Sequence, residues 1–299
     1  MKLKKIVITT GYQCDNDCLF CNVGDKDKTY NRSSKDIENI LIKEYKNGFR
    51  AAEFIGGEAT NRKDIISLIK KAKRIGYKQI SIESNGRAFS DDKFTRDAIW
   101  AGLNRIMFSI HGHNAQIHDR LTRTKGSFNQ AVKGLRNVNK YPEVSVYTNF
   151  VINKVNFRHI EKYLKFILQF NLGVALLSFV RPTGNALINQ KKIIPKVSEA
   201  AFYLREALKK LPTAKVKIQH IPLCLLETQK ELSTRAIDVK RSFMNSENKK
   251  TNFTKEIRRS KIQPRCCKEC ILSNDCDGIW KEYYNIYGSK ELKAVKYSV

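Results

Sequence analysis

The chain has 299 residues, of which 28% are charged and 41% hydrophobic, so it can bury one sizeable α/β domain and a smaller appendage. No apolar run approaches the roughly 18 residues that a membrane span needs, and the start Met-Lys-Leu-Lys-Lys is unlike a signal peptide. These features predict a soluble cytoplasmic protein. The net charge of +27 favours acidic partners such as RNA, an acidic peptide or a phosphorylated small molecule, although a general bias towards Lys could supply much of it.

Up to about residue 219 the sequence alternates strand-like and helix-like segments. Short β-branched runs are followed by amphipathic stretches of helical period, several of them preceded by a capping Ser, Asn or Asp. The expected strands are residues 4–10, 50–55, 79–83, 105–110, 144–151 and 174–180. The expected helices are residues 34–47, 62–75, 91–101, 127–139, 156–170 and 196–210. This alternation predicts βαβ units around a parallel sheet.

The alternation stops after Gln219. We therefore expect a core domain over residues 1–219 and a small Cys-rich extension over residues 220–299. Within the extension, residues 240–265 carry nine Lys or Arg against two Glu. This composition predicts an exposed loop or a loosely held segment.

All eight cysteines lie in two groups, at 14–21 and at 224–276. Disulfide frameworks belong to secreted chains, so this clustering points to metal. The first group, Cys14-x3-Cys18-x2-Cys21, follows the first expected strand. Three thiols within eight residues can hold one face of a [4Fe–4S] cluster and leave one iron open. A zinc knuckle or unrelated structural thiols are the alternatives, although the next twenty residues contain no Cys or His to complete a zinc site.

With Phe20 directly before Cys21, this pattern resembles the radical S-adenosylmethionine (radical SAM) superfamily. The resemblance implies an α/β fold, a partial (β/α)6 barrel, in which Cys14, Cys18 and Cys21 hold the catalytic cluster. The open iron would bind the amino and carboxylate groups of S-adenosylmethionine and cleave it to a 5′-deoxyadenosyl radical. The electron would come from a flavodoxin-type or ferredoxin-type partner.

The strands of a parallel barrel end at one mouth, where ligands bind, and further motifs follow the expected strands. By the resemblance, Gly56-Gly57-Glu58 contacts the amino group of S-adenosylmethionine, with Ala59 where family members often have Pro. Ser84-Asn85-Gly86 resembles the segment near the methionine moiety and the ribose. Further candidates for cofactor contacts are Ser109, Asn149 and Arg181. Arg181 could instead pair with an acidic substrate, or it could be an ordinary surface arginine. Ordinary turns are the alternative for Gly56-Gly57-Glu58, for Ser84-Asn85-Gly86 and for Asn149.

Cys267-x2-Cys270-x5-Cys276 matches the core of the SPASM extension, which binds auxiliary [4Fe–4S] clusters in radical SAM enzymes. Trp280 replaces the next cysteine of the full pattern, so the extension is similar to the shorter twitch variant. The resemblance implies one auxiliary cluster, with Cys266 as an alternative ligand to the set Cys224, Cys267, Cys270 and Cys276. A structural zinc site with the same thiolates is the alternative.

The leading hypothesis is therefore a radical SAM enzyme of oxidoreductase or transferase type that modifies a peptide or protein side chain. RNA modification ranks second because of the positive charge. A non-enzyme hypothesis also remains, a zinc-stabilised basic RNA-binding protein whose cysteines are structural.

Overall fold

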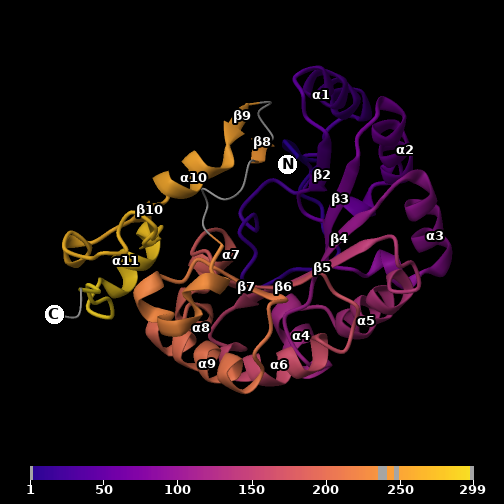
Figure 1. Ribbon diagram of the computed structural model, residues 1–299. Helices are drawn as coiled ribbons and strands as arrows, with labels where there is room; N and C mark the ends of the chain where they lie inside the picture. Colours follow the sequence, from indigo (N-terminus) through magenta and orange to yellow (C-terminus); the bar gives the residue numbers. More distant parts are fainter. Residues whose placement is uncertain (1–2, 235–240, 246–248, 297–299) are drawn as a thin grey trace.

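The computed structural model describes residues 3–234, 241–245 and 249–296, which form a curved sheet surrounded by helices (Figure 1). In the described residues the sheet order is β7-β6-β5-β4-β3-β2-β1-β8-β9. Neighbours from β7 to β8 are parallel, whereas β8 and β9 are antiparallel. The strands are β1 (Lys5–Thr9), β2 (Ala51–Ile55), β3 (Gln79–Ser84), β4 (Arg105–Ser109), β5 (Ser145–Ile152), β6 (Val174–Phe179), β7 (Val216–Gln219), β8 (Arg241–Met244) and β9 (Lys250–Asn252).

Helices connect the strands. They are α1 (Ser34–Lys46), α2 (Ile65–Ile75), α3 (Asp92–Ala101), α4 (Ala115–Thr122), α5 (Ser127–Val138), α6 (Ile160–Ile167), α7 (Asn185–Ile188), α8 (Gln190–Ile193) and α9 (Val197–Lys210). Most of them lie outside the curved sheet, whereas α7 lies on its inner side beside the loop that follows β1 (Figure 1). The C-terminal extension adds α10 (Phe253–Arg259), the two-stranded sheet β10 (Lys261–Ile262) and β11 (Ile279–Trp280), and α11 (Lys281–Tyr287). Local signals set several ends: Ser33 Oγ accepts from the Asp36 N–H to cap α1, and Gly76 ends α2 at φ +107°.

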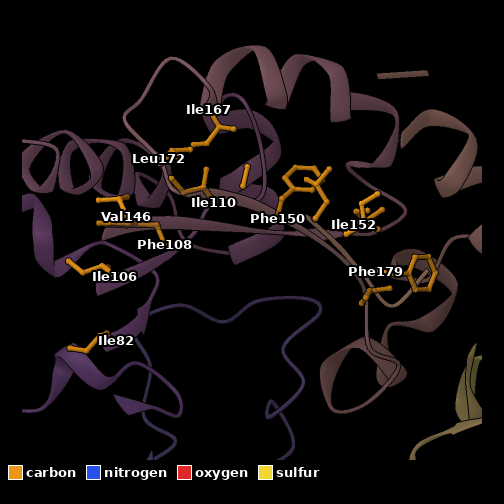
Figure 2. Packing of buried hydrophobic residues seen from close by; sticks show 14 of the residues in the cluster. Ile82, Ile106, Phe108, Ile110, Val146, Phe150, Ile152, Ile167, Leu172 and Phe179 are labelled. Carbon is orange, nitrogen blue, oxygen red and sulfur yellow. The ribbon is translucent and has the colours of Figure 1, made fainter. Parts of the chain in front are cut away.

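The hydrophobic core fills the space between the outer face of the sheet and the helices. Alternate residues of each strand point to this side, among them Ile106 and Phe108 of β4 and Phe150 of β5 (Figure 2). The opposite, inner face carries polar residues such as Glu53 and Ser81, which lie opposite each other on β2 and β3. A polar inner face gives the barrel an interior suited to a polar ligand.

The α/β partial barrel predicted from the sequence is confirmed. Strands β1 to β6 match the six expected strands, while β7 and helix α4 were not predicted. Within the residues that the structure describes, no helix is both long enough and apolar enough to cross a membrane.

The expectation of a loosely held segment over residues 240–265 is wrong for the described part of it; residues 240 and 246–248 lie outside the described residues. Strand β8 pairs with β1 and so adds the extension to the sheet of the core. Arg241 of β8 lies 3.9 Å from Glu53, and Lys250 Nζ lies 2.5 Å from Glu44 Oε2. The basic residues are thus used to dock the segment on buried carboxylates.

Helix α11 docks on the other edge of the barrel through two tyrosines. The ring of Tyr283 packs edge-on against Phe179 at the end of β6, and its Oη accepts a 2.8 Å hydrogen bond from the Val197 N–H. The Tyr287 hydroxyl donates to the Ile194 carbonyl at 2.8 Å. The extension therefore touches the barrel near both β1 and β6.

Candidate functional site

The loop that carries Cys14, Cys18 and Cys21 leaves β1 and lies directly against the Gly-Gly-Glu segment. The Gly57 N–H donates to the Gly11 carbonyl and the Glu58 N–H to the Gln13 carbonyl, both at 2.8 Å. A Cβ on Gly57 would lie 2.2 Å from the Gln13 oxygen, and one on Gly56 2.1 Å from the Gly11 oxygen. Only glycine allows the two backbones to approach this closely, so the motif positions the start of the cysteine loop.

The Glu58 carboxylate is buried and fully engaged inside the protein. One oxygen accepts from the Thr60 N–H at 3.1 Å and from the Thr60 hydroxyl at 2.7 Å, and the other accepts from the Asn85 N–H at 2.6 Å. Burial raises the pKa of Glu58, and the three donors act against that shift. The Glu58 side chain thus ties the Gly-Gly-Glu segment to the Ser-Asn-Gly segment after β3.

That second segment also holds the cysteine loop. Asn85 Nδ2 donates to the Asp15 carboxylate at 2.7 Å, and Arg87 forms an ion pair with it at 2.9 Å. Arg87 donates as well to Asn16 Oδ1 at 3.0 Å. Arg87 was not predicted as a site residue, although it directly follows Ser84-Asn85-Gly86.

Two further segments, the C-terminal end of α4 and the start of α7, complete the support. After β4, the Thr122 and Leu121 carbonyls accept from the Asp17 and Leu19 N–H groups at 3.0 and 2.9 Å. After β6, Asn185 donates its N–H to the Cys21 carbonyl and its Nδ2 to the Cys18 carbonyl, both at 2.9 Å. Asn185 was also not predicted as a site residue. Its position directly after Arg181-Pro182-Thr183-Gly184, the turn that follows an expected strand, could have indicated it. Segments after β2, β3, β4 and β6 therefore converge on one cysteine loop.

His111 and His118 form a buried pair behind Phe20. The Phe20 ring meets His111 edge-on at 4.7 Å between centroids. His111 Nδ1 accepts from the Val151 N–H at 3.2 Å, and His118 Nδ1 accepts from the His111 N–H at 3.1 Å. Burial lowers the pKa of both imidazoles, that of His118 to about 4. They are therefore neutral packing groups whose Nδ1 atoms are already used.

Ser109, the last residue of β4, lies opposite Asn149 in the middle of β5. Asn149 Oδ1 is buried without a hydrogen-bond partner in the described structure. A buried amide oxygen without a donor is costly and favours a bound group that supplies one. Ser84 lies opposite Phe108 at the end of β3, and its hydroxyl accepts from the Gly86 N–H at 2.9 Å.

The thiols of the loop have properties that suit a metal cluster. All three are free and partly buried, and the Asn16 N–H points at Cys14 Sγ at 3.4 Å. Burial raises the pKa of the Cys14 thiol to about 11 and that of Cys18 further still. A thiol of this kind is a poor nucleophile, whereas a bound metal deprotonates it outright. N–H groups aimed at sulfur are a known influence on iron–sulfur clusters.

The second cysteine group surrounds a cavity in the extension. Four of its thiols line that cavity: Cys224, Cys267, Cys270 and Cys276. The Gly278 N–H lies 3.4 Å from Cys276 Sγ and the Val295 N–H 3.3 Å from Cys270 Sγ. Cys266 is not among the residues that line the cavity, although it packs against the hydrophobic core as Cys224 and Cys276 do.

In the described part of the chain, no three Cys, His, Asp or Glu side chains come close enough together to hold a single metal ion. A four-iron cluster is larger than one ion, and its thiolates lie further apart than the roughly tetrahedral ligands of zinc.

A comparison with protein-family models identifies the superfamily to which the chain belongs. The family model of the radical SAM superfamily matches residues 8–167, which include the cysteine loop and strands β2 to β5, so the chain belongs to that superfamily. Membership implies a [4Fe–4S] cluster and S-adenosylmethionine as cofactors, and the converging segments fit both.

Curated relatives include a probable GTP 3′,8-cyclase of Saccharolobus islandicus, 30% identical over 174 residues, which are 58% of this chain and 54% of the relative. Another, from Sulfurisphaera tokodaii, is 24% identical over 61% of this chain and 58% of the relative. The chain thus spans little more than half the length of the curated relatives it matches.

Solved structures share the fold over almost the whole chain. SuiB of Streptococcus suis bound to S-adenosylmethionine has a TM-score of 0.68 at 16% identity, covering 98% of this chain and 76% of SuiB. The enzyme anSMEcpe with bound AdoMet has a TM-score of 0.67 at 14% identity, covering 97% and 93%. The likeness therefore includes the extension.

Proposed function

We propose that this chain binds its catalytic [4Fe–4S] cluster through Cys14, Cys18 and Cys21 and abstracts a hydrogen atom from an anionic substrate. The observation that carries the proposal is the convergence of the four segments after β2, β3, β4 and β6 on the cysteine loop. Cluster and S-adenosylmethionine together supply the 5′-deoxyadenosyl radical. The protein supplies position, shielding and the substrate contacts.

The side chains at the mouth have separate tasks in this proposal. Because the Glu58 carboxylate is already occupied, the contact to the amino group of S-adenosylmethionine comes from backbone atoms of residues 56–58. Asn149 Oδ1 offers an unpaired acceptor to the ribose hydroxyls. Asn85 joins Glu58 to Asp15 of the cysteine loop, Ser84 fixes the turn at Gly86, and Ser109 lies beside Asn149 on the inner face.

A second cluster in the extension belongs to the same proposal. Cys224, Cys267, Cys270 and Cys276 would be its ligands, because these four line the cavity while Cys266 lies outside it. An auxiliary cluster can take up an electron from a substrate radical or bind the substrate directly. Structural zinc is the competing occupant of the same thiols.

For the substrate we favour a small phosphorylated molecule of the nucleotide class. The relatives at 30% identity are named probable GTP 3′,8-cyclases, and a net charge of +27 attracts anions. A peptide or protein side chain, which the SPASM-like cysteine spacing suggests, is the second candidate. RNA modification has the same positive charge in its favour. The reductant, of flavodoxin or ferredoxin type, is likewise part of the proposal.

Anaerobic reconstitution tests this function. The loaded enzyme should contain about eight iron atoms per chain, consistent with two four-iron clusters. Addition of dithionite and S-adenosylmethionine should then release 5′-deoxyadenosine, measured by chromatography. Zinc in place of iron, together with no 5′-deoxyadenosine from a preparation in which a known radical SAM enzyme is active, would support the basic RNA-binding protein instead.

A further inference from the structure

A group of basic side chains surrounds one buried indole where the barrel meets the extension. Trp280 of β11 is 1% exposed. Arg181, just after β6, has its Cζ 5.1 Å from the ring centroid, and Lys261 of β10 has its Nζ 4.9 Å from it. His220, just after β7, packs its ring on the same indole at 4.6 Å between centroids.

Within the described residues neither Arg181 nor Lys261 forms a salt bridge, and the contacts of both cations are with the face of the indole. Arg181 Nε and Trp280 Nε1 are buried without a hydrogen-bond acceptor in the described structure. Burial lowers the pKa of Arg181, and Glu282 and Glu256 act against that shift without forming an ion pair with it in the described residues. Glu282 Oε2 is also buried without a hydrogen-bond partner there. Burial lowers the pKa of Lys261 to about 8, and the charges of Asp277 and Cys276 act against that shift. Because an unpaired buried charge is costly, the arrangement favours an anion supplied from outside.

The backbone at His220 supports the same conclusion. His220 has φ +67°, a left-handed conformation that few non-glycine residues adopt. It follows the last residue of β7, so the strained residue turns the chain at the barrel mouth, where substrates of parallel barrels bind. Strain of this kind persists where the surrounding structure requires it, often at ligand sites.

The number and kind of donors indicate the class of anion. A guanidinium, an ammonium and an indole N–H together offer more charge and more donors than one carboxylate with two oxygens can use. A phosphate group carries between one and two negative charges and three terminal oxygens, which suits this set better. The planar guanidinium of Arg181 can donate hydrogen bonds to two of those oxygens at once.

We propose that Arg181, Lys261 and Trp280 bind a phosphate group of the substrate, with His220 packed behind the indole. This inference deepens and rests on the proposed function, because it places the substrate between the ends of β6 and β7 and the second cysteine group. Trp280 follows Cys276 by four residues, and Gln263, two residues after Lys261, donates to the Cys276 carbonyl at 2.7 Å. The phosphate site is thereby coupled to the thiol cavity through β10 and β11.

Calorimetric titration of the cluster-loaded enzyme with pyrophosphate tests the site. Salt at ~0.3 M screens general attraction by the basic surface. We expect saturable binding that weakens about tenfold or more in Arg181→Gln and in Lys261→Gln, the loss of a charge-assisted contact worth ~1.4 kcal/mol or more. Trp280→Phe keeps the ring but removes the N–H, and should weaken binding about threefold to tenfold. Lys281→Gln, an exposed neighbour with the same change in charge, should bind as the unaltered enzyme does.

The outcomes separate the site from the proposed function. Equal weakening in all the charge variants, or no saturable binding at all, would overturn the phosphate site. The phosphate site would also be overturned if Arg181→Gln and Lys261→Gln bound pyrophosphate unchanged but shifted the midpoint potential of the second cluster. The two cations would then serve to neutralise the negative charge of the cluster thiolates. Acetate in place of pyrophosphate should bind at least tenfold more weakly; equal binding would assign the site to carboxylates. Release of 5′-deoxyadenosine, measured on the same samples, reports on the proposed function independently.

Discussion

The backbone N–H of Asn85 donates a 2.6 Å hydrogen bond to Glu58 Oε2, which joins the segments after β2 and β3 behind the cysteine loop. The same carboxylate also caps the short 3-10 helix Ala59–Asn61 through the Thr60 N–H. In a Glu58→Gln variant the amide oxygen can keep the bonds to Thr60. The amide NH2 group would then face the Asn85 N–H, so that two hydrogen-bond donors meet without an acceptor.

We therefore expect Glu58→Gln to lower the free energy of unfolding by about 2 kcal/mol, the cost of a buried donor without an acceptor. Binding of S-adenosylmethionine should weaken as well, because Asn85 also positions Asp15. Urea unfolding and equilibrium dialysis measure the two effects. Glu38→Gln, which alters an exposed ion pair on α1, serves as the control and should change the free energy of unfolding by well under 1 kcal/mol. An equal change in both variants would contradict the role assigned to Glu58.

Gly57→Ala should prevent assembly of the catalytic cluster. The new Cβ would lie 2.2 Å from the Gln13 oxygen and 2.4 Å from the Tyr12 oxygen, so the backbone before Cys14 must move. We expect iron content to fall by about half, since one of two four-iron clusters is lost. Gly48→Ala is the matched control, because nothing lies within 4 Å of that Cβ and only the positive φ costs ~1 kcal/mol. Full iron content in Gly57→Ala would show that the loop tolerates the displacement.

Arg241→Gln should loosen the attachment of the extension to β1. Burial would raise the pKa of Glu53, but Arg241 and Lys5 outweigh burial and hold that pKa below its ordinary value. Removing Arg241 leaves Glu53 with Lys5 alone at 2.8 Å, and breaking a buried charge network costs about 3 kcal/mol. Urea unfolding and limited proteolysis after residue 219 should both detect the change. Arg259→Gln, from an exposed pair with Glu256, should leave both readouts unaltered.

Stability should decrease as the pH falls below 6.5. Burial lowers the pKa of His118 to about 4, so the unfolded chain takes up a proton between pH 6.5 and 4 that the folded chain refuses. The unfolded state binds more protons in this window, so the free energy of unfolding rises with pH. For His118 alone the difference between pH 6.5 and 5.5 should be about 1 kcal/mol.

Urea unfolding at the two pH values checks this prediction. His118→Asn should remove about 1 kcal/mol of the pH dependence, while His113→Asn, whose imidazole is only partly buried, should remove less. Identical pH dependence in the unaltered protein and in His118→Asn would mean that the unfolded state does not gain the proton at this position.

The sequence predicted the strands best where a β-branched run is followed directly by a glycine-containing motif of the site. Strands β1 to β6 follow from β-branched runs, and their ends are marked by Gly-Gly-Glu and Ser-Asn-Gly. Strand β7 escaped prediction because Val216-Lys-Ile-Gln is short and half polar. Nothing in Arg241–Met244 indicates a partner strand more than two hundred residues earlier, so the docking of β8 on β1 required the structure.

The same limit applies to the side chains at the site. Cysteine spacing indicated two groups of metal ligands, yet only the cavity separates Cys266 from the other four thiols. Arg87 and Asn185 hold the cysteine loop although they lie 66 and 164 residues after Cys21 in the sequence. Arg181, Lys261 and Trp280 meet only because the extension folds back onto the barrel.

The response of each cluster to S-adenosylmethionine tests the central claim most directly. Electron paramagnetic resonance of the dithionite-reduced protein would compare a variant with Ala at Cys14, Cys18 and Cys21 to one with Ala at Cys224, Cys267, Cys270 and Cys276. We predict one cluster in each variant, with a spectrum that S-adenosylmethionine changes only where Cys14, Cys18 and Cys21 remain. A spectrum that still responds to S-adenosylmethionine after their replacement would contradict the assignment.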